Sequence, residues 1–240
     1  MAKLYVIGLG PGGRENMTLR AIDTIKKCDV IVGYRPYLEY VEDLIEGKEI
    51  FSTGMRGEIE RCKYSIEMVQ KGKDTAIIST GDAGLYGMAG PILELADDIE
   101  VEIVPGVTAA FSAASELGSP IMHDYASISL SDLLTPWDVI LKRLEHASIA
   151  DFVITLYNPR SKGRPGHLEE AINTILKHRS EDTPVGLVRN SGREGTVVWS
   201  EKLGSIDYEK VDMMTVIIIG NSNTYFKGEK IVTPRGYEIK

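Results

Sequence analysis

Cysteine is nearly absent, with only Cys28 and Cys62 among 240 residues. Two cysteines are too few for a disulfide framework, and neither lies in a CxxC or Cys/His spacing that would bind zinc or an iron–sulfur cluster. We therefore expect no metal site. Free thiols are typical of a reducing compartment, so the composition favours a cytoplasmic protein.

Long apolar runs and an excess of positive charge are also missing. No apolar stretch approaches the roughly 18 residues that a membrane-spanning helix needs, and Met1–Gly8 runs into a strand-like segment without a signal-peptide apolar region. Lys and Arg number 27 against 35 Asp and Glu, a net charge of −8. We expect a soluble protein with no membrane and no nucleic-acid partner, because nucleic-acid binding needs a basic surface. An anionic small molecule held by a few local arginines is compatible with this charge.

Short apolar runs alternate with helical stretches along the whole chain, and this alternation predicts an α/β fold. The 43% hydrophobic content is sufficient for one large or two small cores. Gly118-Ser119-Pro120 is the best candidate for a linker near the middle of the chain. We predict two α/β domains, residues 1–118 and 119–240.

The central feature is a strand-like run, Thr75–Ser79, that ends in four glycines between Gly81 and Gly90. Ligands of open α/β sheets collect at the carboxyl ends of strands, where glycines let the backbone approach them closely. Asp82 is the only charged residue among these glycines. Its carboxylate either accepts hydrogen bonds from a ligand or caps the following helix.

The first predicted strand, Lys3–Leu9, leads into Gly8-Leu9-Gly10-Pro11-Gly12-Gly13, which is literally the G-x-G-x-x-G of dinucleotide sites. A lone match is a weak signal, and two details oppose a nicotinamide site. Pro11 lacks an N–H, and the helix is expected to start late, with Thr18 as its N-cap. In addition, the next strand ends in Gly33-Tyr34, without the acidic residue that would hold a ribose.

Polar and basic loops follow other predicted strands. Arg35 lies among three tyrosines and Arg56 lies in a glycine-rich loop, where each either binds a carboxylate or is a solvated surface charge. Ser161–Gly166, with Lys162 and Arg164, has the composition of a mobile basic lid. The run His123–Asp132 is dense in groups that exchange protons, although the residues alone indicate only a polar loop.

Five segments of the chain occur together in an order that resembles the tetrapyrrole methylase family. The matching segments, which span nearly the whole chain, are Gly8–Gly13, Gly81–Gly87, Pro105–Ala109, Tyr157–Arg160 and Met214–Asn221. Such an ordered set is more specific than any single motif. Within the family, Ser52–Arg56, Ser79–Met88, His123–Trp137 and Tyr157–Ser161 resemble the members that methylate C17 of a corrinoid precursor and contract its ring.

The resemblance implies two unequal α/β domains with the active site in the cleft between them, in a homodimer. It implies S-adenosylmethionine as the methyl donor, S-adenosylhomocysteine as the product and a tetrapyrrole as the substrate, either precorrin-3B or cobalt-factor III. Alternative functions are methylation at C11 or C20, a nicotinamide-dependent oxidoreductase and a non-catalytic tetrapyrrole carrier.

Site residues follow from the resemblance position by position. Those expected to bind the cofactor, many through backbone groups, are Leu9, Gly81, Asp82, Leu85, Tyr86, Thr108, Ala109, Leu156, Tyr157, Leu187 and Thr215. Ring contraction requires proton transfer, for which the candidates are His123, Asp124 and Asp132. Ser127 and Ser129 are their expected hydrogen-bond partners at the substrate. Arg35, Arg56 and Arg160 are expected to bind the substrate's carboxylates.

Overall fold

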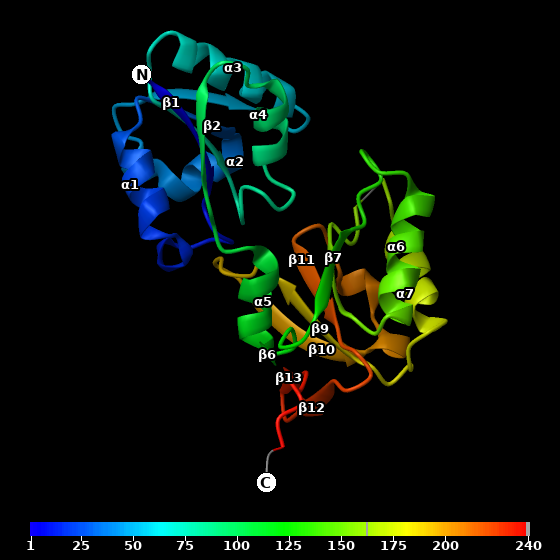
Figure 1. Ribbon diagram of the computed structural model, residues 1–240. Helices are drawn as coiled ribbons and strands as arrows, with labels where there is room; N and C mark the ends of the chain where they lie inside the picture. The colour runs from blue at the N-terminus through cyan, green and yellow to red at the C-terminus, as the bar shows by residue number, and fades with distance from the viewer. Residues whose placement is uncertain (162, 239–240) are drawn as a thin grey trace. The chain divides into compact units, whose positions relative to one another are not determined.

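The computed structural model describes residues 1–161 and 163–238, and it divides into two compact units, one of Met1–Ala109 and one that begins at Ala110 (Figure 1). Each unit contains a five-stranded sheet with helices packed on it, which confirms the predicted α/β class. None of the helices in the described ranges combines the length and apolarity of a bilayer-spanning segment.

The first unit is a fully parallel sheet of strand order β3-β2-β4-β1-β5. Its strands are β1 (Lys3–Gly8), β2 (Val30–Tyr34), β3 (Glu49–Thr53), β4 (Thr75–Ser79) and β5 (Glu100–Val104). Its helices are α1 (Leu19–Lys27), α2 (Arg35–Leu38), α3 (Glu58–Gln70) and α4 (Ala89–Leu95), with 3-10 turns η1 (Arg14–Asn16) and η2 (Glu39–Leu44). Because all five strands run the same way, their carboxyl ends share one edge.

Alternate strand residues of this unit face two separate cores. In β1, Tyr5 and Ile7 pack on the side of α1 and η2, whereas Leu4 and Val6 pack on the side of α3 and α4. The predicted cap of α1 is confirmed, since Thr18 Oγ1 accepts a hydrogen bond from the Ala21 N–H at 3.1 Å. On the other side of the sheet, Cys62 is fully buried, and burial raises the pKa of its thiol to about 11.

The second unit is a mixed sheet of order β10-β9-β11-β8-β7, in which β7, β8 and β9 run one way and β10 and β11 the other. Its strands are β7 (Tyr125–Ser129), β8 (Val153–Tyr157), β9 (Pro184–Arg189), β10 (Val197–Lys202) and β11 (Thr215–Ile219). Its helices and turns are α5 (Ala109–Leu117), α6 (Trp137–Ile149), α7 (His167–Leu176), η3 (Leu203–Ser205) and η4 (Tyr208–Lys210). A small sheet joins β12 (Tyr225–Lys227), β13 (Lys230–Val232) and β6 (Gly118–Ser119).

Helices cover both faces of the second sheet. Helices α6 and α7 lie side by side over one face and bury Ile154 and Leu156 (Figure 1). Helix α5 lies against the other face, where Leu117 fills the space above Gly186. The segment expected to be a linker, Gly118-Ser119-Pro120, instead contains β6, which pairs with β13. Small residues here therefore serve close packing rather than flexibility.

Substitution of Gly186 tests this packing. A Cβ at Gly186 would lie 2.4 Å from Leu117 Cδ1, and Leu117 is only 1% exposed, so Gly186→Ala forces α5 off the sheet. We expect a loss of about 1–3 kcal/mol in the free energy of unfolding. Both tryptophans, Trp137 and Trp199, lie in this unit, so urea unfolding followed by tryptophan fluorescence reports it. Gly166→Ala is the matched control, because no atom lies within 4 Å of the place that its Cβ would take. Equal unfolding midpoints for the two variants would contradict the packing argument.

Candidate functional site

The carboxyl edge of the first sheet collects all the site residues predicted in that unit. Each lies in a loop that follows one of the five parallel strands or at the first residue of the helix after it. These residues are Leu9 after β1, Arg35 after β2, Arg56 after β3, Gly81, Asp82, Leu85 and Tyr86 after β4, and Thr108 and Ala109 after β5. The predicted positions therefore lie together at one edge of this sheet, which we call its ligand edge.

Three loop backbones meet at this edge with no room for side chains between them. A Cβ on Gly8 would lie 2.6 Å from the Gly81 carbonyl oxygen, and a Cβ on Gly106 would lie 2.2 Å from the same atom. Gly10 and Gly81 also exchange two backbone hydrogen bonds, of 3.0 and 2.7 Å. Glycine is thus required by packing at Gly8 and Gly106, and these contacts hold the loops after β1, β4 and β5 together.

Asp82 joins two of these loops through its carboxylate. Oδ1 accepts a hydrogen bond from the Gly84 N–H at 2.8 Å, and Oδ2 accepts one from the Gly106 N–H at 3.0 Å. Asp82 does not cap the next helix, because α4 begins at Ala89 and its N-cap is Met88. Asp82 therefore positions the loops, a role that neither sequence-based alternative included.

Side chains at this edge differ in their exposure. Leu9 and Thr108 are buried, so a ligand would meet mainly their backbone groups, whereas Arg35 and Arg56 are exposed. Tyr86 is exposed and has a left-handed backbone, with φ of 56°. A non-glycine residue in this region of φ/ψ space is uncommon and often marks a functional loop.

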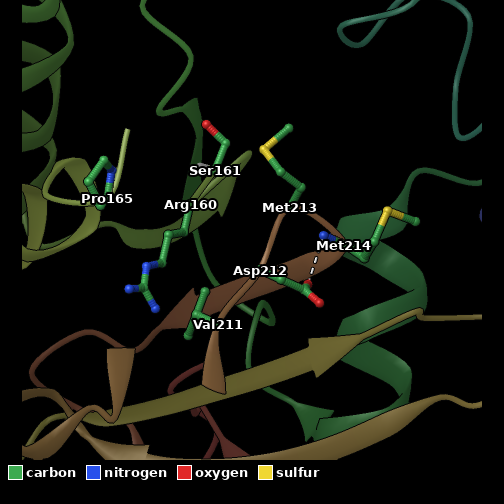
Figure 2. Close-up of a pocket in the computed structure, with 7 residues that line it drawn as sticks. All are labelled: Arg160, Ser161, Pro165, Val211, Asp212, Met213 and Met214. Atoms are coloured by element: carbon green, nitrogen blue, oxygen red, sulfur yellow. Dashed lines mark hydrogen bonds between the residues drawn. The ribbon is translucent and has the colours of Figure 1, made fainter. Parts of the chain in front are cut away.

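The second unit has its own ligand edge, where β7, β8 and β9 end and β10 and β11 begin. A pocket of about 370 Å³ opens there (Figure 2). It is lined by Arg160, Ser161, Pro165, Val211, Asp212, Met213 and Met214. The Met214 N–H donates to Asp212 Oδ1 at 2.9 Å, and this bond shapes the turn that presents both thioethers. The lining is mostly apolar, as in pockets for flat organic ligands.

Four predicted cofactor residues lie on the strands that end or begin at this edge. Leu156, Leu187 and Thr215 are almost fully buried, so their side chains belong to the interior, and Thr215 Oγ1 donates to Asp212 Oδ1 at 2.9 Å. Tyr157 has a clear structural task, because its hydroxyl oxygen accepts a hydrogen bond from the Ala110 N–H at 2.9 Å, at the start of α5. These residues shape the edge, and contact with a ligand would come chiefly from their backbone.

The arginines of the loop after β8 are already paired within the protein. Arg160 donates to the Tyr208 carbonyl oxygen and to Glu209 Oε1, both at 2.6 Å, and Figure 2 shows its side chain directed away from the two thioethers. Arg164 donates to the Leu130 carbonyl oxygen at 2.8 Å and to Ser161 Oγ at 3.2 Å. This part of the predicted lid is therefore anchored. Lys162 lies outside the described residues.

The three candidates for proton transfer do not come together. His123 and Asp124 precede β7 and line a separate pocket of about 180 Å³ with Asp151 and Asn221, at the opposite edge of the sheet. Asp132 follows β7 and lies at the ligand edge. Of the expected hydrogen-bond partners, Ser129 Oγ accepts a bond from Asn158 Nδ2 at 2.9 Å, also at this edge, and Ser127 lies further back in β7.

Asp132 pairs with a residue that the sequence did not single out. His167 Nε2 lies 3.1 Å from Asp132 Oδ2, and Arg164 Nε lies 3.8 Å from Asp132 Oδ1. Partial burial alone would raise the pKa of Asp132, but the hydrogen bond with His167, a backbone hydrogen bond and the charges of His167 and Arg164 together lower it. The usable signal for His167 is its position directly after the basic loop Ser161–Gly166.

Comparisons with known proteins identify the family of this chain. A family profile described as Tetrapyrrole (Corrin/Porphyrin) Methylases matches residues 3–207. A protein of Salmonella typhimurium named "Probable cobalt-factor III C(17)-methyltransferase" is 49% identical over 240 residues, covering 98% of this chain and 100% of that protein.

Two solved structures have the same fold. The crystal structure of the methyltransferase CobJ superposes with a TM-score of 0.92 at 31% identity, covering 98% of this chain and 100% of that one. A uroporphyrin-III C-methyltransferase from Thermus thermophilus, complexed with S-adenosylhomocysteine, superposes with a TM-score of 0.68 at 22% identity, covering 91% and 92%. With a family match over most of its length and a relative that aligns from end to end, this chain belongs to the tetrapyrrole methylases, which use S-adenosylmethionine.

Proposed function

We propose that this protein transfers a methyl group from S-adenosylmethionine to C17 of cobalt-factor III, with contraction of the macrocycle, in cobalamin biosynthesis. The observation that carries this proposal is the similarity to the Salmonella relative, at 49% identity over 98% of this chain and 100% of that protein. The match with the CobJ structure supports the same proposal. A nicotinamide-dependent reaction is disfavoured, because the loop after Gly8 leads into η1 and the first α-helix starts only at Leu19.

The loops of the first unit fit an S-adenosyl ligand. A Cβ on Gly81 would meet no atom closer than 4.0 Å, the nearest being the Ala109 nitrogen, so the loop has room on that side. Gly81 also has φ of 69°, a left-handed conformation that glycine adopts without strain. Backbone groups at Gly81 and Ala109 would thus hold the ligand, with Asp82 fixing the loops around them.

The bound cofactor supplies an electrophilic methyl group on a positively charged sulfur. Because the positive charge disappears as the methyl group moves to carbon, a protein accelerates this displacement mainly by alignment and by exclusion of water. Loops fixed by backbone contacts suit the first task, alignment of the methyl group with its acceptor carbon. The apolar lining of the pocket at Met213 and Met214 suits the second.

We also propose that the enzyme works in the cytoplasm, as its cysteine content indicates, and as a homodimer, as its family resemblance implies. The two cysteines are buried, free thiols, which is compatible with a reducing compartment. Light scattering of the purified protein tests the dimer directly, and a mass of 26.4 kDa, that of one chain, would contradict it.

The methylation is tested by incubating the protein with methyl-labelled S-adenosylmethionine and each of two substrates, cobalt-factor III and precorrin-3B. We expect one label per macrocycle, located at C17 by NMR, with the cobalt-containing substrate preferred in kcat/KM. A label at C11 or C20 would instead identify another corrinoid methylase, and no transfer at all would exclude the proposed function.

Asp82→Ala tests the loop-fixing role of this carboxylate. Removing it leaves the Gly84 and Gly106 N–H groups without their acceptor, so we expect a loss of about 1–3 kcal/mol in unfolding free energy. Affinity for S-adenosylhomocysteine, measured by calorimetry, should fall as the loops separate. Asp82→Asn keeps a side-chain oxygen acceptor and should lose less unfolding free energy and less affinity than Asp82→Ala. Unchanged affinity in the alanine variant would remove Asp82 from the cofactor site.

Arg35 and Arg56 are the proposed contacts for the substrate's carboxylates, since both are exposed at the ligand edge of the first sheet. Replacing either by alanine should raise KM for the macrocycle about 10-fold, the effect of losing one charge-assisted hydrogen bond worth about 1.5 kcal/mol. Affinity for S-adenosylhomocysteine should stay the same. Arg20→Ala is the control, because Arg20 pairs with Glu102 on the surface at 2.8 Å. An unchanged KM in both variants would exclude the two arginines.

A further inference from the structure

Two histidine–aspartate pairs lie in the second unit, at opposite edges of its sheet. The His123–Asp124 pair is loose, with 3.6 Å between Nδ1 and Oδ2, and the Asp124 carboxylate is mostly exposed. His123 Nδ1 moreover accepts a hydrogen bond from the backbone N–H of Asp124 at 2.8 Å. The His167–Asp132 pair is tighter, at 3.1 Å, and it lies at the edge that carries the 370 Å³ pocket.

The hydrogen bond between the His167 ring and Asp132 uses one of the two ring nitrogens. Its Nε2 faces Asp132 Oδ2, and an N–H at this position donates to the carboxylate. In the neutral ring the other nitrogen, Nδ1, then carries the lone pair. A carboxylate that fixes the tautomer of a histidine and stabilises its protonated form is the arrangement of general acid–base sites.

Two further side chains hold this pair in place. Arg164 is 12% exposed, and its guanidinium touches three separate segments, at the Leu130 carbonyl oxygen, Ser161 Oγ and Met213 Sδ. Ser161 and Met213 also line the 370 Å³ pocket, so Arg164 links the Asp132 carboxylate to the pocket wall. On the other side, the Trp137 ring packs against the His167 ring, 4.1 Å away from centre to centre.

We propose that His167 transfers the proton that ring contraction requires, with Asp132 and Arg164 as its positioning residues. This inference rests on the proposed function, because the proton transfer that it assigns belongs to the ring contraction included in that function. The O–H bond of a hydroxyl group on the macrocycle breaks, its electron pair stays on oxygen, and a new N–H bond forms at His167 Nδ1. The resulting imidazolium is stabilised by the Asp132 carboxylate, and it returns the proton in a later step.

The charges around His167 suit both protonation states. Asp132 faces the ring directly, Arg164 faces the far carboxylate oxygen, and Glu170, one turn along α7, accepts a hydrogen bond from Trp137 Nε1 at 2.8 Å. With a neutral ring, Arg164 offsets one of the two carboxylates, Asp132 and Glu170, and one negative charge remains. With a protonated ring, the two carboxylates balance Arg164 and the imidazolium. The pair therefore exchanges a proton without leaving a large uncompensated charge.

His167→Gln is the first variant to examine. Glutamine keeps a donor toward Asp132 at the start of α7 but has no group that accepts a proton at neutral pH, so the fold should remain intact while turnover falls. With cobalt-factor III and S-adenosylmethionine we expect kcat to fall about 10²- to 10⁴-fold, with unchanged affinity for S-adenosylhomocysteine by calorimetry. His178→Gln is the matched control, since His178 pairs with Glu145 at 3.6 Å beyond the other end of the same helix.

Chemical rescue separates proton transfer from a merely structural role. In His167→Ala, added imidazole should occupy the vacated space and restore part of kcat, with a rate that depends on imidazole concentration. Asp132→Asn should lower kcat, because an amide does not stabilise the imidazolium, and imidazole should not restore it. Unfolding by urea, followed by tryptophan fluorescence, verifies that each variant is folded.

The outcomes separate this inference from the proposed function. If the unmodified protein does not methylate cobalt-factor III, the proposed function fails whatever the variants do. If it does, and His167→Gln turns over at the normal rate, the inference alone is overturned. A slow His167→Ala variant that imidazole does not accelerate, or a loss of turnover in His123→Ala but not in His167→Gln, would overturn it equally.

Discussion

The ligand edge of the first unit depends on backbone packed directly against backbone. The Gly81 carbonyl oxygen lies so close to Gly8 and Gly106 that neither position has room for a Cβ, and the Asp82 carboxylate holds the Gly106 N–H in place. With no side chains between the loops, the surface that remains is made of peptide groups at fixed positions. Peptide groups bind a ligand through directional hydrogen bonds and lose little entropy in doing so. This explains why so few reactive side chains occur among the expected cofactor residues.

Much of this fold was readable from the sequence because its causes are local. Strand-length apolar runs and the Thr18 cap act within a few residues, and each was found where expected. Gly118 was misread for the opposite reason. Its role depends on β13, more than a hundred residues later, whose Ile231 pairs with it. A glycine that permits close packing and a glycine that gives flexibility look identical until the partner strand is known.

The candidate site also depends on contacts between segments that are distant in sequence, and the sequence alone did not reveal these contacts. Leu156 and Leu187 entered it only through the family resemblance, because nothing in a buried leucine indicates a ligand. Asp132 was selected with His123 because both belong to one polar run, yet β7 lies between them and separates them to opposite edges. His167 was missed because its carboxylate partner is 35 residues away in the sequence. Parallel strands join the ends of distant segments, and composition does not reveal which ends meet.

Charge presents one further constraint, since an enzyme with a net charge of −8 is proposed to bind a macrocycle rich in carboxylates. Repulsion between exposed charges is largely screened beyond about 8–10 Å at physiological salt, so the nearest cations decide the balance. The guanidinium groups of Arg160 and Arg164 already pair with Glu209, Asp132 and carbonyl oxygens, so they have less capacity to bind a substrate. Their positive charge instead stabilises the protein's own loops. This balance favours the proposed recognition of the carboxylates by exposed arginines such as Arg35 and Arg56. It also favours the proposed proton transfer by His167, a ligand-edge histidine whose carboxylate partner is held by an arginine.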